Sequence, residues 1–114
     1  MAKPIFELGS VHTGNLTDLV ETVPKGIVSK TLLDTPAVKQ VLFSFDAGQE
    51  LTEHRSPFTA IVHLLEGQII FRTGQTPHPM KSQDVLVMPP QEPHALTTIQ
   101  PSRMLLTLIK TQNA

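Results

Sequence analysis

Cysteine is absent from the 114-residue chain, so disulfides, thiolate metal sites and cysteine nucleophiles are all excluded. An excess of positive charge is also missing, because nine lysine and arginine residues stand against ten aspartate and glutamate residues. Proteins that bind a phosphate backbone need clustered basic side chains. The composition therefore argues against nucleic acid as a partner.

Long apolar segments are missing as well. No run approaches the roughly twenty residues that cross a bilayer, and the first residues lead into polar sequence without the apolar core of a signal peptide. We therefore expect a cytoplasmic protein with no membrane partner. Hydrophobic residues still make up 39% of the chain and charged residues 17%, which favours a single folded domain over residues 1–114.

Ten prolines and six glycines divide the chain into short segments, which disfavours long helices. In the segment 38–45, Val41, Phe43 and Phe45 fall on one face of an expected strand. Further strands are expected at residues 27–33, 51–56, 60–65, 68–73, 84–88, 94–99 and 104–109. About eight short strands at regular spacing predict an all-β sandwich or barrel.

Two other segments have a less regular pattern. Residues 1–26 are expected to be irregular, and within them 15–23 fits either one short helix capped by Asn15 or a loop packed across the barrel. The segment 74–79 is expected to be a loop or hairpin that exposes His78.

The segment from Gly48 to Gly67 resembles the first sequence motif of the cupin superfamily. That motif places a His-x-His pair and a glutamate at fixed distances between two glycines. Here His54 stands at the first histidine position, Ser56 replaces the second histidine and Ala60 replaces the glutamate. The spacing of the motif is retained, but two of its metal ligands are not.

A second segment resembles the other cupin motif. Pro89 and His94 stand at its proline and histidine, whereas Gln83 and Gln91 stand at its two glycines and Thr98 at its asparagine. The order and spacing of both motifs are similar to those of small single-domain cupins. The resemblance implies a cupin-type double-stranded β-helix, or jelly-roll barrel, with its core over about residues 27–109.

The resemblance also implies a site inside the barrel. Metal-binding cupins hold their ion with three histidines and one glutamate, and only His54 and His94 remain here. We therefore expect a pocket with no tightly held cofactor. Its expected ligand-binding residues are His54, Ser56, His94, Met88 and Met104. The alternative is a divalent transition metal, Fe, Mn, Ni or Zn, held by His54 and His94.

Three functions stay open on these residues. The leading interpretation is a protein that binds a small organic molecule in an apolar pocket. The first alternative is a metal-dependent enzyme of the dioxygenase or isomerase type with a two-histidine site, and the second is a non-catalytic module that senses a metabolite. The acids nearest to the histidines in sequence, Glu50, Glu53 and Glu92, are expected in loops.

A homodimer is the expected assembly. Several expected strands carry apolar residues on both faces, and an outer apolar face needs a cover. His63 has the opposite parity to Ala60 and Val62, so we expect it to pack under the other sheet or at a dimer contact.

Overall fold

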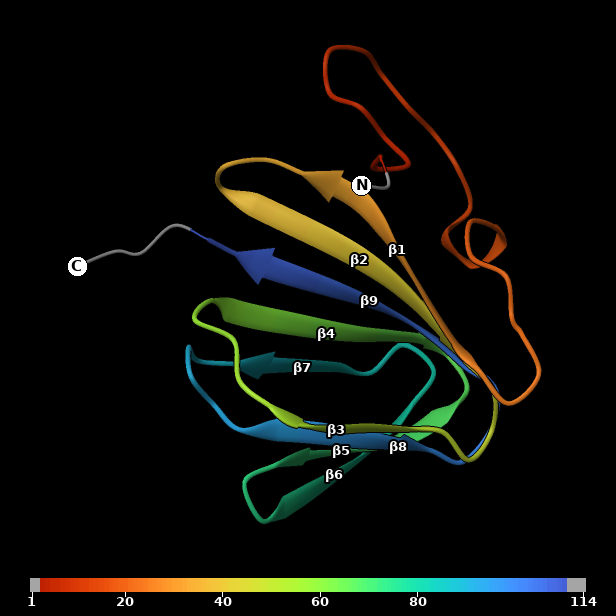
Figure 1. The fold of residues 1–114 in the computed structure, drawn as a ribbon, viewed down its shortest axis with the longest axis vertical. Helices are drawn as coiled ribbons and strands as arrows, with labels where there is room; N and C mark the ends of the chain where they lie inside the picture. The colour runs from red at the N-terminus through yellow and green to blue at the C-terminus, as the bar shows by residue number, and fades with distance from the viewer. Residues whose placement is uncertain (1–2, 111–114) are drawn as a thin grey trace.

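A computed structural model describes residues 3–110, which form two antiparallel β-sheets facing each other (Figure 1). The strands are β1 (Ile27–Asp34), β2 (Val38–Phe45), β3 (Glu50–His54), β4 (Thr59–Glu66), β5 (Gln68–Thr73), β6 (Thr76–Lys81), β7 (Val85–Met88), β8 (His94–Thr98) and β9 (Ser102–Ile109). The five-stranded sheet has the order β1-β2-β9-β4-β7, and the four-stranded sheet has the order β3-β8-β5-β6. Repeated crossing between two sheets is the jelly-roll arrangement, which confirms the predicted all-β fold.

The main core lies between the two sheets. Because side chains alternate along a strand, each sheet points every second residue inward. Phe45 and Leu64 extend from the five-stranded sheet and meet Phe71, Ile69 and Leu96 from the four-stranded sheet, all of them nearly inaccessible to solvent. Each such side chain contributes about 1.5–3 kcal/mol through burial.

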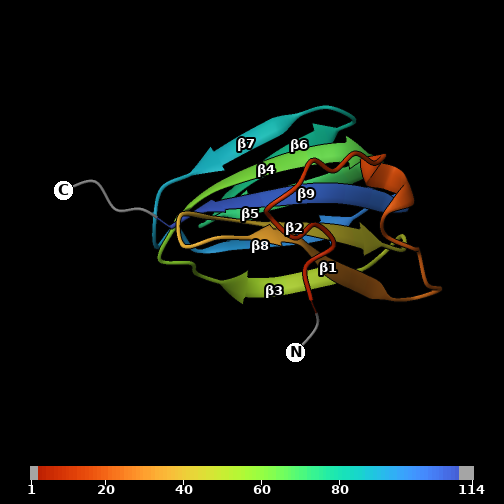
Figure 2. The same ribbon diagram turned by 90° about the horizontal axis from the view of Figure 1, so that it is seen from above.

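A second core lies on the outer face of the five-stranded sheet, under the N-terminal segment (Figure 2). Leu32, Leu42 and Leu65 point outward from the sheet and are covered by residues that precede β1. The covering residues are Ile5, Phe6, Leu16, Leu19 and Val20. Part of the outer apolar face that the sequence shows is therefore covered by the chain itself.

The N-terminal segment combines the two expected conformations of residues 15–23. It contains one 3-10 turn, η1 (Leu16–Asp18). Asn15 caps the start of this turn, because its Oδ1 accepts a hydrogen bond from the Thr17 N–H at 3.1 Å. The rest of the segment crosses the sheet without regular structure. Within residues 3–110, no helix is long and apolar enough to span a membrane.

Two glutamines occupy left-handed backbone positions. Gln83 has φ of 74° and Gln91 has φ of 68°, and these are the positions where the cupin motif has glycine. A side chain in this conformation costs roughly 1–2 kcal/mol per residue. Gln83 offsets the cost because its amide donates to the Leu65 carbonyl and its Oε1 lies 2.9 Å from His63 Nε2. The Gln91 side chain is exposed.

Gln91→Gly should raise the free energy of unfolding by about 0.5–1 kcal/mol. The reason is that the strain energy removed from the folded state exceeds the free energy by which glycine's extra conformational freedom stabilises the unfolded state. Gln83→Gly is the matched control and should lower stability, since it removes two hydrogen bonds along with the strain. Urea denaturation of both variants measures the difference. Equal loss of stability in the two would contradict the strain argument at Gln91.

Homodimerisation remains a prediction, and strand β7 is the surface on which we expect it. Val85 and Val87 are each 63% exposed on the outer face of this edge strand. The double variant Val85→Lys, Val87→Lys should convert a dimer into a monomer of about 12.5 kDa, as measured by light scattering. Val11→Lys is the control, because Val11 is 92% exposed in the N-terminal loop and should leave the mass unchanged. A wild-type monomer would overturn the prediction.

Candidate functional site

His54 and His94 face each other where β3 ends and β8 begins. The two residues are cross-strand partners in antiparallel pairing, and their Nε2 atoms lie 3.0 Å apart. Their ring centroids are 4.1 Å apart at an interplanar angle of 63°. The structure therefore brings together the two histidines that the sequence predicts as a site.

A β-bulge in β3 makes this meeting possible. Leu51 pairs with Leu96, and His54 pairs with His94, so three steps along β3 match two steps along β8. Without the extra residue, alternation would point His54 to the face opposite Leu51. The bulge instead turns both Leu51 and His54 toward the interior.

The backbone fixes the tautomer of both rings. His54 Nδ1 lies 3.0 Å from the Thr52 carbonyl, and His94 Nδ1 lies 2.8 Å from the Glu92 carbonyl. A carbonyl oxygen only accepts, so each Nδ1 carries the hydrogen. Each neutral ring then presents a lone pair at Nε2, and the two lone pairs point at each other. Their short contact requires one shared electrophile, such as a proton, a hydrogen of a ligand or a metal ion.

The environment of His94 favours its neutral form. Burial lowers the pKa of His94, and this effect outweighs the bond to the Glu92 carbonyl, which raises it. The nearby His54 also lowers the pKa of His94. On its other side the ring stacks on Phe71, with centroids 5.8 Å apart and planes inclined by 13°.

Stability should fall on mild acidification because of His94. Its pKa is 6.5 in the unfolded chain and lower in the folded one, so the unfolded state binds more protons as the pH falls below 6.5. The free energy of unfolding should therefore be highest above this value and decline as the pH passes down through the lowered pKa. His94→Gln should make the decline between about pH 7 and 5 shallower in urea titrations. An unchanged slope would contradict the assignment.

Below the two histidines lies a small apolar cavity. It is lined by Phe43, Leu51, His54, Val62, Phe71, Met88, His94, Ala95, Leu96, Met104 and Leu106. The space open to the centre of a water molecule is about 30 Å³, enough for about two waters. Met88 and Met104 thus line the cavity together with both histidines, as the sequence predicts.

Ser56 has a different position from the other expected site residues. It is not among the residues that line the cavity, and its Oγ accepts from the Phe58 N–H at 3.2 Å. Its carbonyl accepts from the Gln91 N–H at 2.7 Å. Ser56 therefore ties together the two loops beside the histidines.

The carboxylates do not join the histidines. Glu50 and Glu53 are exposed on strand β3, so the expected loop position was wrong for both, and Glu92 in its loop offers its carbonyl to His94. Ala60, at the glutamate position of the cupin motif, is 3% exposed in the core. Among residues 3–110 no group of three or more histidine, aspartate or glutamate side chains could hold a metal. Two imidazoles are fewer than the three protein ligands of a catalytic zinc site.

The structure corrects the expected positions of two other histidines. His63 lies on the outer face of β4, where its Nε2 bonds Gln83 Oε1 at 2.9 Å, so it does not pack under the other sheet, and the alternative position at a dimer contact remains a prediction. His78 lies within strand β6 and is half-buried, not exposed in a loop. The flanking prolines Pro77 and Pro79 suggested a loop, but alternating prolines also fit an edge strand, and β6 is an edge strand.

Comparison with known proteins agrees with this architecture. The family profile of the cupin domain matches residues 41–109. A conserved protein of unknown function from Streptococcus pyogenes has 28% sequence identity and a TM-score of 0.84, with 98% of each chain covered. A Cupin 2 conserved barrel domain protein from Leptotrichia buccalis has 33% identity and a TM-score of 0.81, covering 85% of this chain and 47% of that one. A search of curated proteins finds no match.

Proposed function

This chain belongs to the cupin-domain family, and we propose that it binds a small organic molecule at the mouth of the barrel. The observation that carries the proposal is the pair of Nε2 atoms, 3.0 Å apart, on two rings that line an apolar cavity. A ligand group that offers a hydrogen, such as a hydroxyl or a protonated acid, satisfies both nitrogens better than they satisfy each other. His54 and His94 are then the polar anchor of the site.

The apolar part of the ligand would contact the cavity walls. Since the free space holds about two waters, only a short apolar group enters it without movement of side chains. The rest of the ligand would lie at the mouth, beside the exposed His54 ring. Met88 and Met104 suit this role, because a flexible thioether side chain adapts its shape to different apolar groups.

Binding has more support than turnover. A histidine that acts as a base usually pairs with a carboxylate that stabilises its protonated form, and within residues 3–110 neither His54 nor His94 has a hydrogen bond to a carboxylate. Both rings are oriented by neutral backbone carbonyls. A binder or a metabolite-sensing module is therefore the better account than an acid–base enzyme.

A metal-dependent enzyme is the second candidate, and the convergence of the two Nε2 atoms favours it. His54 and His94 would hold the ion, with water or substrate in the remaining positions, and the ion would act as a Lewis acid. Nδ1 bonds to carbonyls are the usual support for histidines that bind metals. Two protein ligands hold an ion loosely, so we propose binding without a resident metal.

A small-molecule screen by thermal shift, run with and without a chelator, tests the proposed function. Binders should raise Tm by several degrees at saturating concentration, equally in both conditions. The double variant His54→Ala, His94→Ala should lose the shift, whereas His63→Ala, which alters a histidine on the outer face, should keep it. Shifts that persist in the double variant would overturn the proposed site.

Elemental analysis of the untagged protein separates the two candidates. We expect well under one transition metal per chain when it is purified without added metal or chelator. About one metal per chain, lost in the double histidine variant, would overturn the metal-free proposal in favour of the enzyme.

A further inference from the structure

A second polar pair lies beside His94 on the inner face of the four-stranded sheet. Thr73, the last residue of β5, is the cross-strand partner of His94. Its Oγ1 lies 2.8 Å from Nε2 of His78 on the neighbouring strand β6. His54, His94 and Thr73 therefore follow one another across three strands, and His78 extends the row to the fourth.

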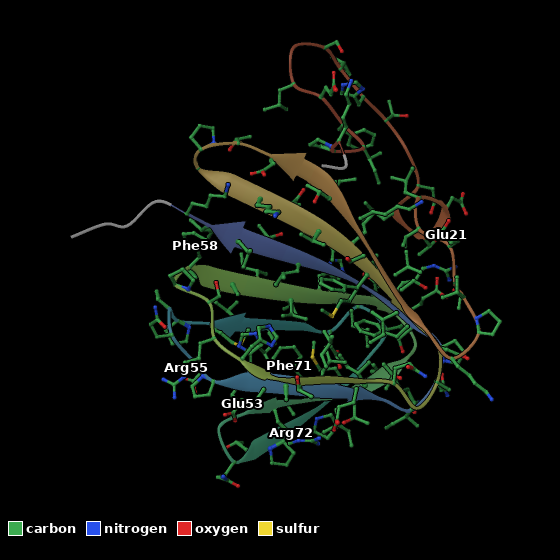
Figure 3. The ribbon with its side chains drawn as sticks, in the orientation of Figure 1. Glu21, Glu53, Arg55, Phe58, Phe71 and Arg72 are labelled. Carbon is green, nitrogen blue, oxygen red and sulfur yellow. The ribbon has the colours of Figure 1, made fainter. Side chains whose placement is uncertain are left out.

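Strand parity places both members of the pair on the interior side. On β6, His78 points to the same side as Met80, which is buried in the main core. The cross-strand partner of His78 on β5 is Phe71. Figure 3 shows Phe71 between the sheets and its neighbour Arg72 on the opposite side of the four-stranded sheet. Phe71 also stacks on His94, with ring centroids 5.8 Å apart.

The Thr73–His78 pair can bind a second polar group of a ligand whose first group is bound by His54 and His94. A hydroxyl both donates and accepts, so the Thr73 hydroxyl retains hydrogen-bonding capacity after it bonds His78. Cross-strand partners hold their Cβ atoms about 5 Å apart. Oxygens on carbons one and three of a short chain span a comparable distance. Thr73 is not among the residues that line the cavity, so a ligand anchored at His54 and His94 would meet Thr73 outside the cavity, beside His94, with its next polar group.

We propose that Thr73 binds a second polar group of the ligand, which makes the ligand a small hydroxy acid or diol. This inference rests on the proposed function, since it needs the ligand to be anchored at His54 and His94. His78 acts through Thr73 as a positioning residue. Its Nε2 either accepts the hydroxyl hydrogen or donates to the hydroxyl oxygen, and so sets which role Thr73 offers to the ligand.

Matched probes test the proposal directly. Butan-1-ol and each enantiomer of butane-1,3-diol share one carbon chain and one terminal hydroxyl that can donate to the histidine pair, and they differ only in the second hydroxyl. Their affinities are measured by titration while the imidazole nitrogen resonances of His54 and His94 are followed by NMR. One enantiomer of butane-1,3-diol should bind about fivefold more tightly than butan-1-ol, the usual effect of one hydrogen bond between neutral groups.

Three variants test whether Thr73 and His78 cause the preference for the probe with the additional hydroxyl. Thr73→Val keeps the shape of the side chain and should reduce the preference to none, and His78→Phe should weaken it without affecting the affinity for butan-1-ol. Thr97→Val is the control, because Thr97 is on the outer face of the same sheet and its hydroxyl accepts from Arg72. It should retain the full preference.

The outcomes distinguish a failure of the contact at Thr73 from a failure of ligand binding at His54 and His94. If butan-1-ol perturbs both histidines but the second hydroxyl adds nothing, or if Thr73→Val retains the preference, the second polar contact is overturned and the proposed function stands. If neither compound perturbs either histidine, the assignment of a small diol or hydroxy acid is overturned, and the thermal-shift screen decides the proposed function separately.

Discussion

The site depends on the bulge that inserts one residue into β3 opposite β8. The pairing of Leu51 with Leu96 is set by the core, and without the extra residue it would direct His54 outward. The bulge turns the side chain of His54, the last residue of β3, to the inner face, and it leaves the pairing of Glu50 and Leu51 unchanged. The inward direction of His54, and with it the short contact between the two rings, follows from this local change.

The pair is held by backbone atoms, which has a chemical consequence. The carbonyls of Thr52 and Glu92 fix the rings through Nδ1 while adding no negative charge at the site. A carboxylate in the same place would stabilise an imidazolium. The neutral support and the burial of His94 instead keep its Nε2 available as an acceptor. The site is thus suited to a neutral or weakly acidic hydrogen, or to a loosely held cation.

Much of the fold was predictable because period-2 patterns and proline or glycine punctuation are local features. The strand over 38–45 was confirmed as β2, and the two glutamines at glycine positions retain the left-handed backbone that the motif requires. Strand β6 was missed, since Pro77 and Pro79 signal a turn unless the strand is known to lie at an edge. Edge position is a tertiary property that the local sequence does not contain.

The site was predictable only in part for the same reason. His54 and His94 were found through the motif spacing, but the bulge and the Thr73–His78 bond depend on which strands are neighbours. For the cover of the outer face, the sequence offered a loop packed across the barrel only at residues 15–23 and did not show that Ile5 and Phe6 join it. The sequence shows apolar residues on both faces of β2, but it does not indicate whether the same chain or another one covers them.

The four open edges of the two sheets differ in how they resist further growth. Prolines interrupt the hydrogen-bonding groups of β6, exposed glutamates lie within β3, and the N–H groups of Ile5 and Phe6 bond carbonyls of β1. Strand β7 consists of Val85, Leu86, Val87 and Met88, so neither charge nor proline interrupts it, and its short length is what limits pairing. Misassembly by strand addition should therefore begin at β7, and insertions that lengthen this strand would increase the tendency to aggregate.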